Sequence, residues 1–191
     1  MTDTDRSSTP LILFLDFDDV ICLNSPYGGY DVLTAFAEAD KRNESLQPTD
    51  ELWSKLFDAE AVEHLKQVHL EFTPQYVLST SWRWFFDRDN LVKTLELGDL
   101  EIVAKHLHQD WSTPQISKQA HRAVEIKGWL NSHPEYANAW AIVDDELSGT
   151  GFDSWPRTLR QYVVLCQEGV GFQKDELRML RHALTIRRLT P

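Results

Sequence analysis

The chain is poor in cysteine and contains no long apolar run. Its two cysteines, Cys22 and Cys166, lie far apart and lack the spacing of a metal site. We therefore expect two free thiols in a reducing compartment, and a cytoplasmic protein. No segment is long enough to predict a transmembrane helix, and the polar first ten residues lack the apolar core of a signal peptide.

The chain is also poor in basic residues. It has 19 lysines and arginines against 30 aspartates and glutamates, a formal net charge of -11. Such a charge repels long nucleic acid, so we expect no strong general nucleic-acid binding. The glycine-rich loop ending in Lys-Ser or Lys-Thr that ATP-driven kinases use is absent as well. Nothing in the sequence predicts an oligomeric state.

What the chain does have is a short apolar run, residues 11–15, directly before Asp16 and Asp18. A β-branched and aromatic run of this kind is typical of a strand buried on both faces of a parallel sheet. Further strand and helix patterns alternate along the chain, which predicts a doubly wound, mostly parallel, Rossmann-like α/β sheet. The predicted strands are 11–15, 76–78, 101–103, 139–143 and 161–165, and the predicted helices are 30–43, 49–56 (starting at Thr49 or Asp50), 59–70, 82–97, 117–130 and 174–188.

The domain organisation is expected to be simple. Residues 1–10 read as a disordered tail, because they are polar and lack periodicity. Residues 11–191 are long enough for one domain with a substantial core. A small helical insertion is expected at about residues 24–58, too short to form a large, separately folded cap.

Polar side chains close three of the predicted strands. Asp16 and Asp18 follow the first strand, Thr80 the second, and Asp144 with Asp145 the fourth. The carboxyl ends of parallel strands share one edge of a sheet, so we expect these residues to converge there. Buried carboxylates are costly unless a cation shares the site, and Mg²⁺ prefers oxygen ligands. The pattern predicts a Mg²⁺ site at which a carboxylate could attack phosphorus.

In the order of these motifs the chain resembles the haloacid dehalogenase (HAD) superfamily of phosphohydrolases, from Leu11 onward. It is most similar to the small HAD-like domains associated with RNA-repair proteins. A turn at 169–171 matches that pattern only loosely. The stretches that carry the closer likeness are Ser79-Thr80-Ser81-Trp82-Arg83, Thr113-Pro114, Arg122 to Leu130 and Asp144-Asp145.

The resemblance implies a role for each of these residues. Asp16 would be the nucleophile that forms an aspartyl-phosphate, and Asp18 the general acid that then becomes the general base. Thr80 would bind a phosphoryl oxygen. Mg²⁺ would be held by Asp16, the carbonyl of Asp18 and one of Asp144 or Asp145, of which we favour Asp145.

Two positions depart from the superfamily pattern. Asp19 stands where glycine is common, which adds a negative charge and affects the loop. The basic residue of the third motif is either Arg122, which the spacing before Glu125 favours, or Lys118, one turn earlier. Arginine neutralises carboxylate and phosphate bidentately but does not replace lysine in every respect.

The residues after Thr80 are candidates for substrate binding. Ser81, Trp82 and Arg83 would lie near the phosphate, with Arg83 able to hold a second phosphate and Trp82 or Trp84 able to stack a base. Packing of the tryptophan against the sheet is an equally good interpretation. The expected partner is a phosphorylated small molecule or nucleic-acid end, best a mononucleotide or short end. His106, His108 and His121 are interpreted as surface or packing residues and not as a zinc site.

Two other classes of protein share parts of this pattern. A phosphoacceptor signalling module like the response-regulator receivers also gathers acidic residues at a sheet edge. Its acceptor aspartate closes a middle strand, however, and no aspartate closes strand 76–78 here. A catalytically inactive binding module would be expected to lack Asp16 or Asp18, and both are present.

Overall fold

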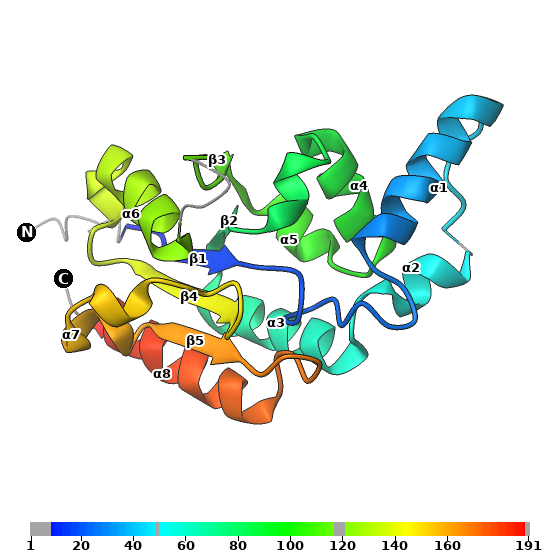
Figure 1. The fold of residues 1–191 in the computed structure, drawn as a ribbon. Coiled ribbons are helices and arrows are strands. Elements are labelled where there is room, and N and C mark those ends of the chain that lie inside the picture. Colours follow the sequence, from blue (N-terminus) through cyan, green and yellow to red (C-terminus); the bar gives the residue numbers. More distant parts are fainter. Residues whose placement is uncertain (1–8, 49, 117–120, 190–191) are drawn as a thin grey trace, which may run out of the picture.

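The computed structural model describes residues 9–48, 50–116 and 121–189 and contains a five-stranded sheet (Figure 1). All neighbouring strands pair in parallel, in the order β3-β2-β1-β4-β5, so the predicted doubly wound α/β fold is confirmed. Residues 1–8 of the predicted tail lie outside the described residues. The strands are β1 (Ile12–Leu15), β2 (Gln75–Leu78), β3 (Leu107–Ser112), β4 (Trp140–Asp145) and β5 (Val163–Cys166).

Strand β1 occupies the centre of the sheet. It pairs with β2 on one side and with β4 on the other, and all four of its side chains are fully buried. This burial on both faces explains why the run is apolar throughout. Leu15 is in register with both Leu78 and Val143, so the residues that follow these three strands emerge at one edge.

Helices cover both faces of this sheet, as right-handed crossovers require. Helices α3 and α8 pack on each other on one face, whereas α6 covers the other, where the Trp129 ring meets Phe14 edge-on at 5.3 Å. Figure 1 shows α1 and α2 beyond the carboxyl ends of the strands. The helices are α1 (Gly29–Arg42), α2 (Glu51–Leu56), α3 (Ala59–Phe72), α4 (Arg88–Leu97), α5 (Glu101–Lys105), α6 (Arg122–Ser132), α7 (Arg157–Arg160) and α8 (Lys174–Leu189), with 3₁₀ turns η1 (Ser81–Trp84), η2 (Pro134–Tyr136) and η3 (Phe152–Ser154).

The predicted strand at 101–103 is wrong. Ile102 and Val103 suggested a strand because they are β-branched, but they belong to helix α5, where Val103 and Ala104 are buried. The third strand is β3, in a segment for which neither a strand nor a helix was predicted. It is an edge strand with several partly exposed polar side chains, so its sequence carries little strand signal.

Two predicted helices start later than expected. The helix predicted from Trp82 is divided into η1 and α4, and α4 begins after Asp87, whose side chain accepts a hydrogen bond from the Asn90 amide at 2.8 Å. The helix predicted from Ser117 begins at Arg122, and residues 117–120 lie outside the described residues.

Within the part of the chain that is described, no helix combines the length and apolar composition needed to cross a membrane.

Candidate active site

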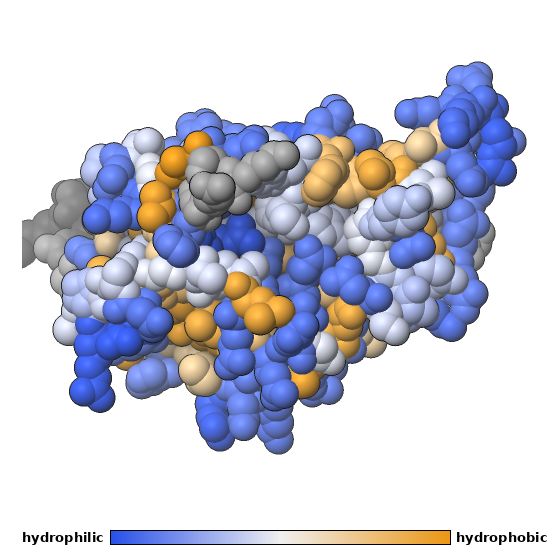
Figure 2. All heavy atoms as spheres, viewed as in Figure 1, coloured by the Kyte–Doolittle hydropathy of each residue, from blue (hydrophilic) through white to orange (hydrophobic). Residues whose placement is uncertain are grey.

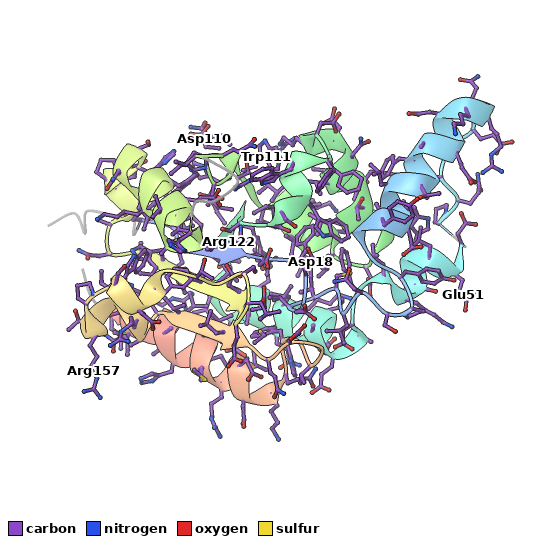
Figure 3. The ribbon with its side chains drawn as sticks, viewed as in Figure 1. Asp18, Glu51, Asp110, Trp111, Arg122 and Arg157 are labelled. Atoms are coloured by element: carbon purple, nitrogen blue, oxygen red, sulfur yellow. The ribbon has the colours of Figure 1, made fainter. Side chains whose placement is uncertain are left out.

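Three carboxylates meet at the carboxyl edge of the sheet. Asp16 follows β1, Asp144 and Asp145 end β4, and all three are buried. An oxygen of each lies within 4.8 Å of the others. Figure 3 labels Asp18 and Arg122 at the same edge. The convergence expected from the sequence is therefore present for these residues.

Ser148, which the sequence analysis missed, lies among the three carboxylates. Its Oγ is 3.1 Å from Asp16 Oδ2 and 2.9 Å from Asp144 Oδ1, and it also contacts Asp145 Oδ2. A hydroxyl has one proton, so Ser148 can donate a hydrogen bond to only one of these carboxylate oxygens at a time. A serine three residues after an acidic pair that ends a strand is the signal that could have revealed it.

The turn after β4 explains how Ser148 reaches this position. Asp145 Oδ1 accepts hydrogen bonds from the backbone amides of Leu147, at 2.6 Å, and Ser148, at 2.9 Å. This arrangement folds the chain back over the strand end, as an aspartate commonly does at a turn. It leaves Asp145 Oδ2 facing the other two carboxylates.

Arg122 brings a positive charge into the cluster. It is the first residue of α6, and its Nε lies 2.9 Å from Asp144 Oδ2 and its Nη2 3.4 Å from Asp16 Oδ1. Burial alone would lower the pKa of this guanidinium, but the carboxylates of Asp144 and Asp16 reverse the effect and raise it. Arg122 is therefore charged and in the position expected of the third motif. Lys118, the other candidate, lies outside the described residues.

A second buried arginine is linked to Arg122 through Glu125. Glu125 Oε1 lies 2.7 Å from Arg83 Nη2, and its Oε2 lies 3.7 Å from Arg122 Nη1. Arg83 also donates to the backbone carbonyl of Thr113 at 2.9 Å, and its side chain is only 5% exposed. The predicted contact of Arg83 with a second phosphate does not fit this placement, because the guanidinium is held inside the protein.

The charges of this buried cluster do not cancel. The cluster consists of four carboxylates and two arginines. If all six were ionised, two negative charges would be uncompensated, which is energetically unfavourable in a buried environment. Burial, with repulsion from Asp144, raises the pKa of Asp16 well above its usual value. Burial also raises the pKa of Asp144 to about 6. The members of the cluster are Asp16, Asp144, Asp145, Glu125, Arg83 and Arg122.

The cluster fits a hard divalent cation. Its donor atoms are oxygens, and one Mg²⁺ would balance its two uncompensated negative charges. The buried Asp16 Oδ1 also has no hydrogen-bond partner among the described residues. Mg²⁺ binds through carboxylates and keeps several waters, so two carboxylates with one backbone carbonyl are sufficient.

Asp18 lies at the border of the cluster and is partly exposed. Its Oδ1 accepts hydrogen bonds from Trp82 Nε1 at 2.9 Å and from Asn24 Nδ2 at 3.2 Å, and its Oδ2 accepts one from Ser81 Oγ at 3.1 Å. Trp82 itself is buried, so it has no free face on which a base could stack. In the structure Ser81 and Trp82 hold Asp18 in place.

Thr80 is fully buried two residues after the end of β2, at the same edge of the sheet as the carboxylates. Its Oγ1 accepts a hydrogen bond from the Trp82 amide at 3.4 Å, at the start of η1. The hydroxyl proton therefore remains available for another acceptor.

Asp19 replaces the common glycine in a backbone conformation that glycine favours. Its φ is 54°, in the left-handed region, which aspartate adopts more easily than most residues. Its Oδ1 accepts a hydrogen bond from the Gly169 amide at 2.8 Å. Asp19 thus connects the loop after β1 to the turn after β5.

A second group of potential metal ligands lies on β3 and at the end of α6. It consists of His108, Asp110 (labelled in Figure 3) and His133. His133 Nε2 lies 2.8 Å from Asp110 Oδ2, and the His133 ring stacks on Trp129 at 3.8 Å between centroids. His108 Nδ1 accepts a hydrogen bond from the Asp110 amide at 3.0 Å. These nitrogens are engaged in contacts within the protein.

Comparison with known proteins identifies one family. A family model described as "HAD domain in Swiss Army Knife RNA repair proteins" matches residues 12–177. The matched range extends from β1 into α8 and includes every residue of the buried cluster. Searches of the curated proteins and of the solved structures found no match.

The raised carboxylate pKa values predict a pH-dependent response to metal. The folded, metal-free protein binds more protons than the unfolded chain between the usual carboxyl pKa and about 6, so its stability falls as the pH rises through that range. Mg²⁺ bound to the ionised carboxylates would oppose this loss. We expect Mg²⁺ to raise the melting temperature more at about pH 7.5 than at about pH 5.

Thermal unfolding with Mg²⁺ or with a chelator, at matched ionic strength, measures this difference. A potassium salt serves as the control for screening. Equal shifts at both pH values would show that the buried carboxylates do not bind the metal.

Glu125→Ala is expected to destabilise the protein by about 3 kcal/mol, because it removes the only carboxylate that is paired with Arg83 among the described residues. The matched control is Glu96→Ala, which breaks an exposed pair with Lys93 and should cost less than about 1 kcal/mol. Urea unfolding in a chelator gives both free energies. Similar losses in the two variants would mean that Glu125 does not stabilise the buried chain of charges.

Proposed function

This chain belongs to the family of HAD domains in Swiss Army Knife RNA repair proteins, and we propose that it is a Mg²⁺-dependent phosphohydrolase. The proposed substrate is a phosphorylated nucleotide or nucleic-acid end, and the proposed intermediate is an aspartyl-phosphate on Asp16. The observation that carries the proposal is the buried cluster of oxygen ligands with its uncompensated negative charge, directly beside the partly exposed Asp18.

Asp16, Asp145 and the backbone carbonyl of Asp18 would hold the Mg²⁺. Asp145 is favoured over Asp144 because Arg122 already pairs with Asp144, whereas Asp145 has no ion pair among the described residues. When bound, the metal would neutralise carboxylate charge and polarise the phosphoryl group. Its charge would also favour the ionised form of Asp16, which burial otherwise opposes.

The protein residues divide the reaction between them. The Asp16 carboxylate attacks phosphorus, the bond between phosphorus and the leaving oxygen breaks, and Asp18 gives that oxygen its proton. Asp18 then takes a proton from a water that attacks the phosphorus, which releases phosphate and restores Asp16. Arg122 provides positive charge beside Asp16, and the Thr80 hydroxyl donates to a phosphoryl oxygen.

The residues after Thr80 act by positioning in this scheme. Ser81 and Trp82 fix the Asp18 carboxylate, and Arg83 fixes Glu125 and through it Arg122. The two thiols, Cys22 and Cys166, are free and buried, which supports a reducing compartment, and we propose the cytoplasm.

Asp16→Asn should lower kcat for a phosphate ester by about a thousandfold or more, because the amide is a poor nucleophile. The same substitution removes a buried charge, so the metal-free variant should unfold at a temperature no lower than the wild type at neutral pH. Steady-state kinetics and thermal unfolding measure the two effects. A folded variant with near-normal turnover would exclude the aspartyl-phosphate mechanism.

Trp82→Phe should lower kcat about tenfold and change the pH profile, because it keeps the ring but removes the N–H that bonds Asp18. Trp84→Phe is the matched control, two residues later and only half-buried. Kinetics of both variants across pH test this role. Equal effects on kcat in the two variants, without a change in pH profile, would assign Trp82 to packing alone.

A further inference from the structure

A cavity of about 290 Å³ opens beside Asp18, between α1 and η1. Asp18, Ser81 and Trp82 line it on the side of the catalytic cluster, and Tyr30, Leu33 and Phe85 line it toward solvent. Figure 2 shows apolar surface in this region, between α4 and α1. The cavity is thus continuous with the candidate active site.

The outer part of the cavity carries large apolar side chains that are unusually exposed. Tyr30 is 81% exposed, Phe85 68% and Leu33 38%. Tyr30 and Leu33 lie one turn apart on α1, and Phe85 directly follows η1, so two separate elements present their side chains to one space. A group of exposed apolar side chains around a cavity is typical of a ligand-binding surface.

The position of Asp18 indicates which part of a substrate would enter the cavity. This step rests on the proposed function, in which Asp18 protonates the leaving oxygen. A general acid must lie within hydrogen-bond reach of that oxygen, so the leaving group lies on the Asp18 side of the phosphorus. Because Asp18 also lines the cavity, the leaving group would occupy it.

The chemistry of the lining selects the kind of leaving group. Asp18 is the only charged residue among the described residues that line the cavity, so nothing there would hold a second phosphate. The aromatic side chains of Tyr30 and Phe85 suit a planar ring, and base stacking on such side chains tolerates any base. The volume is close to the lower limit of about 300 Å³ for ligand pockets, which suits a single base and sugar.

We propose that this cavity binds the nucleobase of a leaving nucleoside, which stacks on Tyr30 and Phe85. This assignment moves base recognition from Trp82 to the insertion helix α1 and the residue after η1. Gly29 couples the two parts of the site, because a Cβ there would lie 3.0 Å from the Trp82 ring. The start of α1 therefore rests on the indole that holds Asp18.

The test compares substrates that differ only in the base. The kcat/KM of adenosine 5′-monophosphate is measured against that of ribose 5-phosphate, and its 3′ isomer is assayed alongside as a second nucleotide. We expect the wild type to prefer a nucleotide, and Tyr30→Ala and Phe85→Ala each to lower that preference about tenfold. Tyr30→Phe should retain it. Leu70→Ala, an 83% exposed side chain that does not line the cavity, is the control.

A second measurement does not depend on turnover. Titration calorimetry of adenosine 5′-monophosphate into the Asp16→Asn protein should show weaker binding when Tyr30→Ala is added. If the wild type hydrolyses no phosphate ester but Tyr30→Ala still weakens nucleotide binding, the base site is retained and the proposed hydrolase function is rejected.

Three results would overturn the inference while leaving a phosphatase. The first is equal kcat/KM for nucleotides and ribose 5-phosphate in the wild type. The second is a preference that Tyr30→Ala and Phe85→Ala leave unchanged. The third is a Tyr30-dependent preference for p-nitrophenyl phosphate without one for nucleotides, which would assign the cavity to an aryl group.

Discussion

A chain of buried charges with an excess of two negative charges constrains the whole carboxyl edge of the sheet. Arg83, Glu125, Arg122 and the carboxylates of Asp16 and Asp144 form successive contacts, and Asp145, which lies beside Asp16 and Asp144, brings the excess to two. The members are buried, so removal of Glu125 would leave the Arg83 charge unpaired, whereas Arg122 has a carboxylate to spare because it contacts both Asp16 and Asp144. The excess remains even when all contacts are made. The ion pairs therefore offset only part of the cost of burying these charges, and a bound cation would offset more of it.

This chain of contacts explains why motifs far apart in the sequence occur together. Arg83 follows β2, Glu125 and Arg122 lie on one turn of α6, and Asp144 ends β4. Thr113, just after β3, accepts from Arg83 through its backbone carbonyl. The Trp-Arg, Thr-Pro, Arg-x-x-Glu and Asp-Asp stretches are therefore parts of one network of ion pairs and hydrogen bonds that joins β2, β3, α6 and β4 around β1.

The sequence predicted those features whose signal is local. The β1 run is apolar because it is buried on both faces, and parallel topology then brings Asp16 to Asp144 and Asp145. Edge strand β3 was missed because an exposed edge needs few apolar residues. Ser148 and the burial of Arg83 were missed because both depend on contacts with residues distant in sequence or on the fold of a turn. Such contacts leave no periodic pattern to read.

Asp18 separates two regions with opposite physical character. On one side lie the buried carboxylates and arginines, where charge dominates, and on the other lies the aromatic cavity, where Asp18 is the only charge among the described lining residues. A substrate that suits both must carry its charge on one phosphate and be neutral and planar beyond it. The net charge of -11 adds to this selection, because it repels a polyanion over a longer distance than it repels a single phosphate. Under the proposed function, charge and cavity together favour a mononucleotide or a terminal nucleotide over the interior of a long strand.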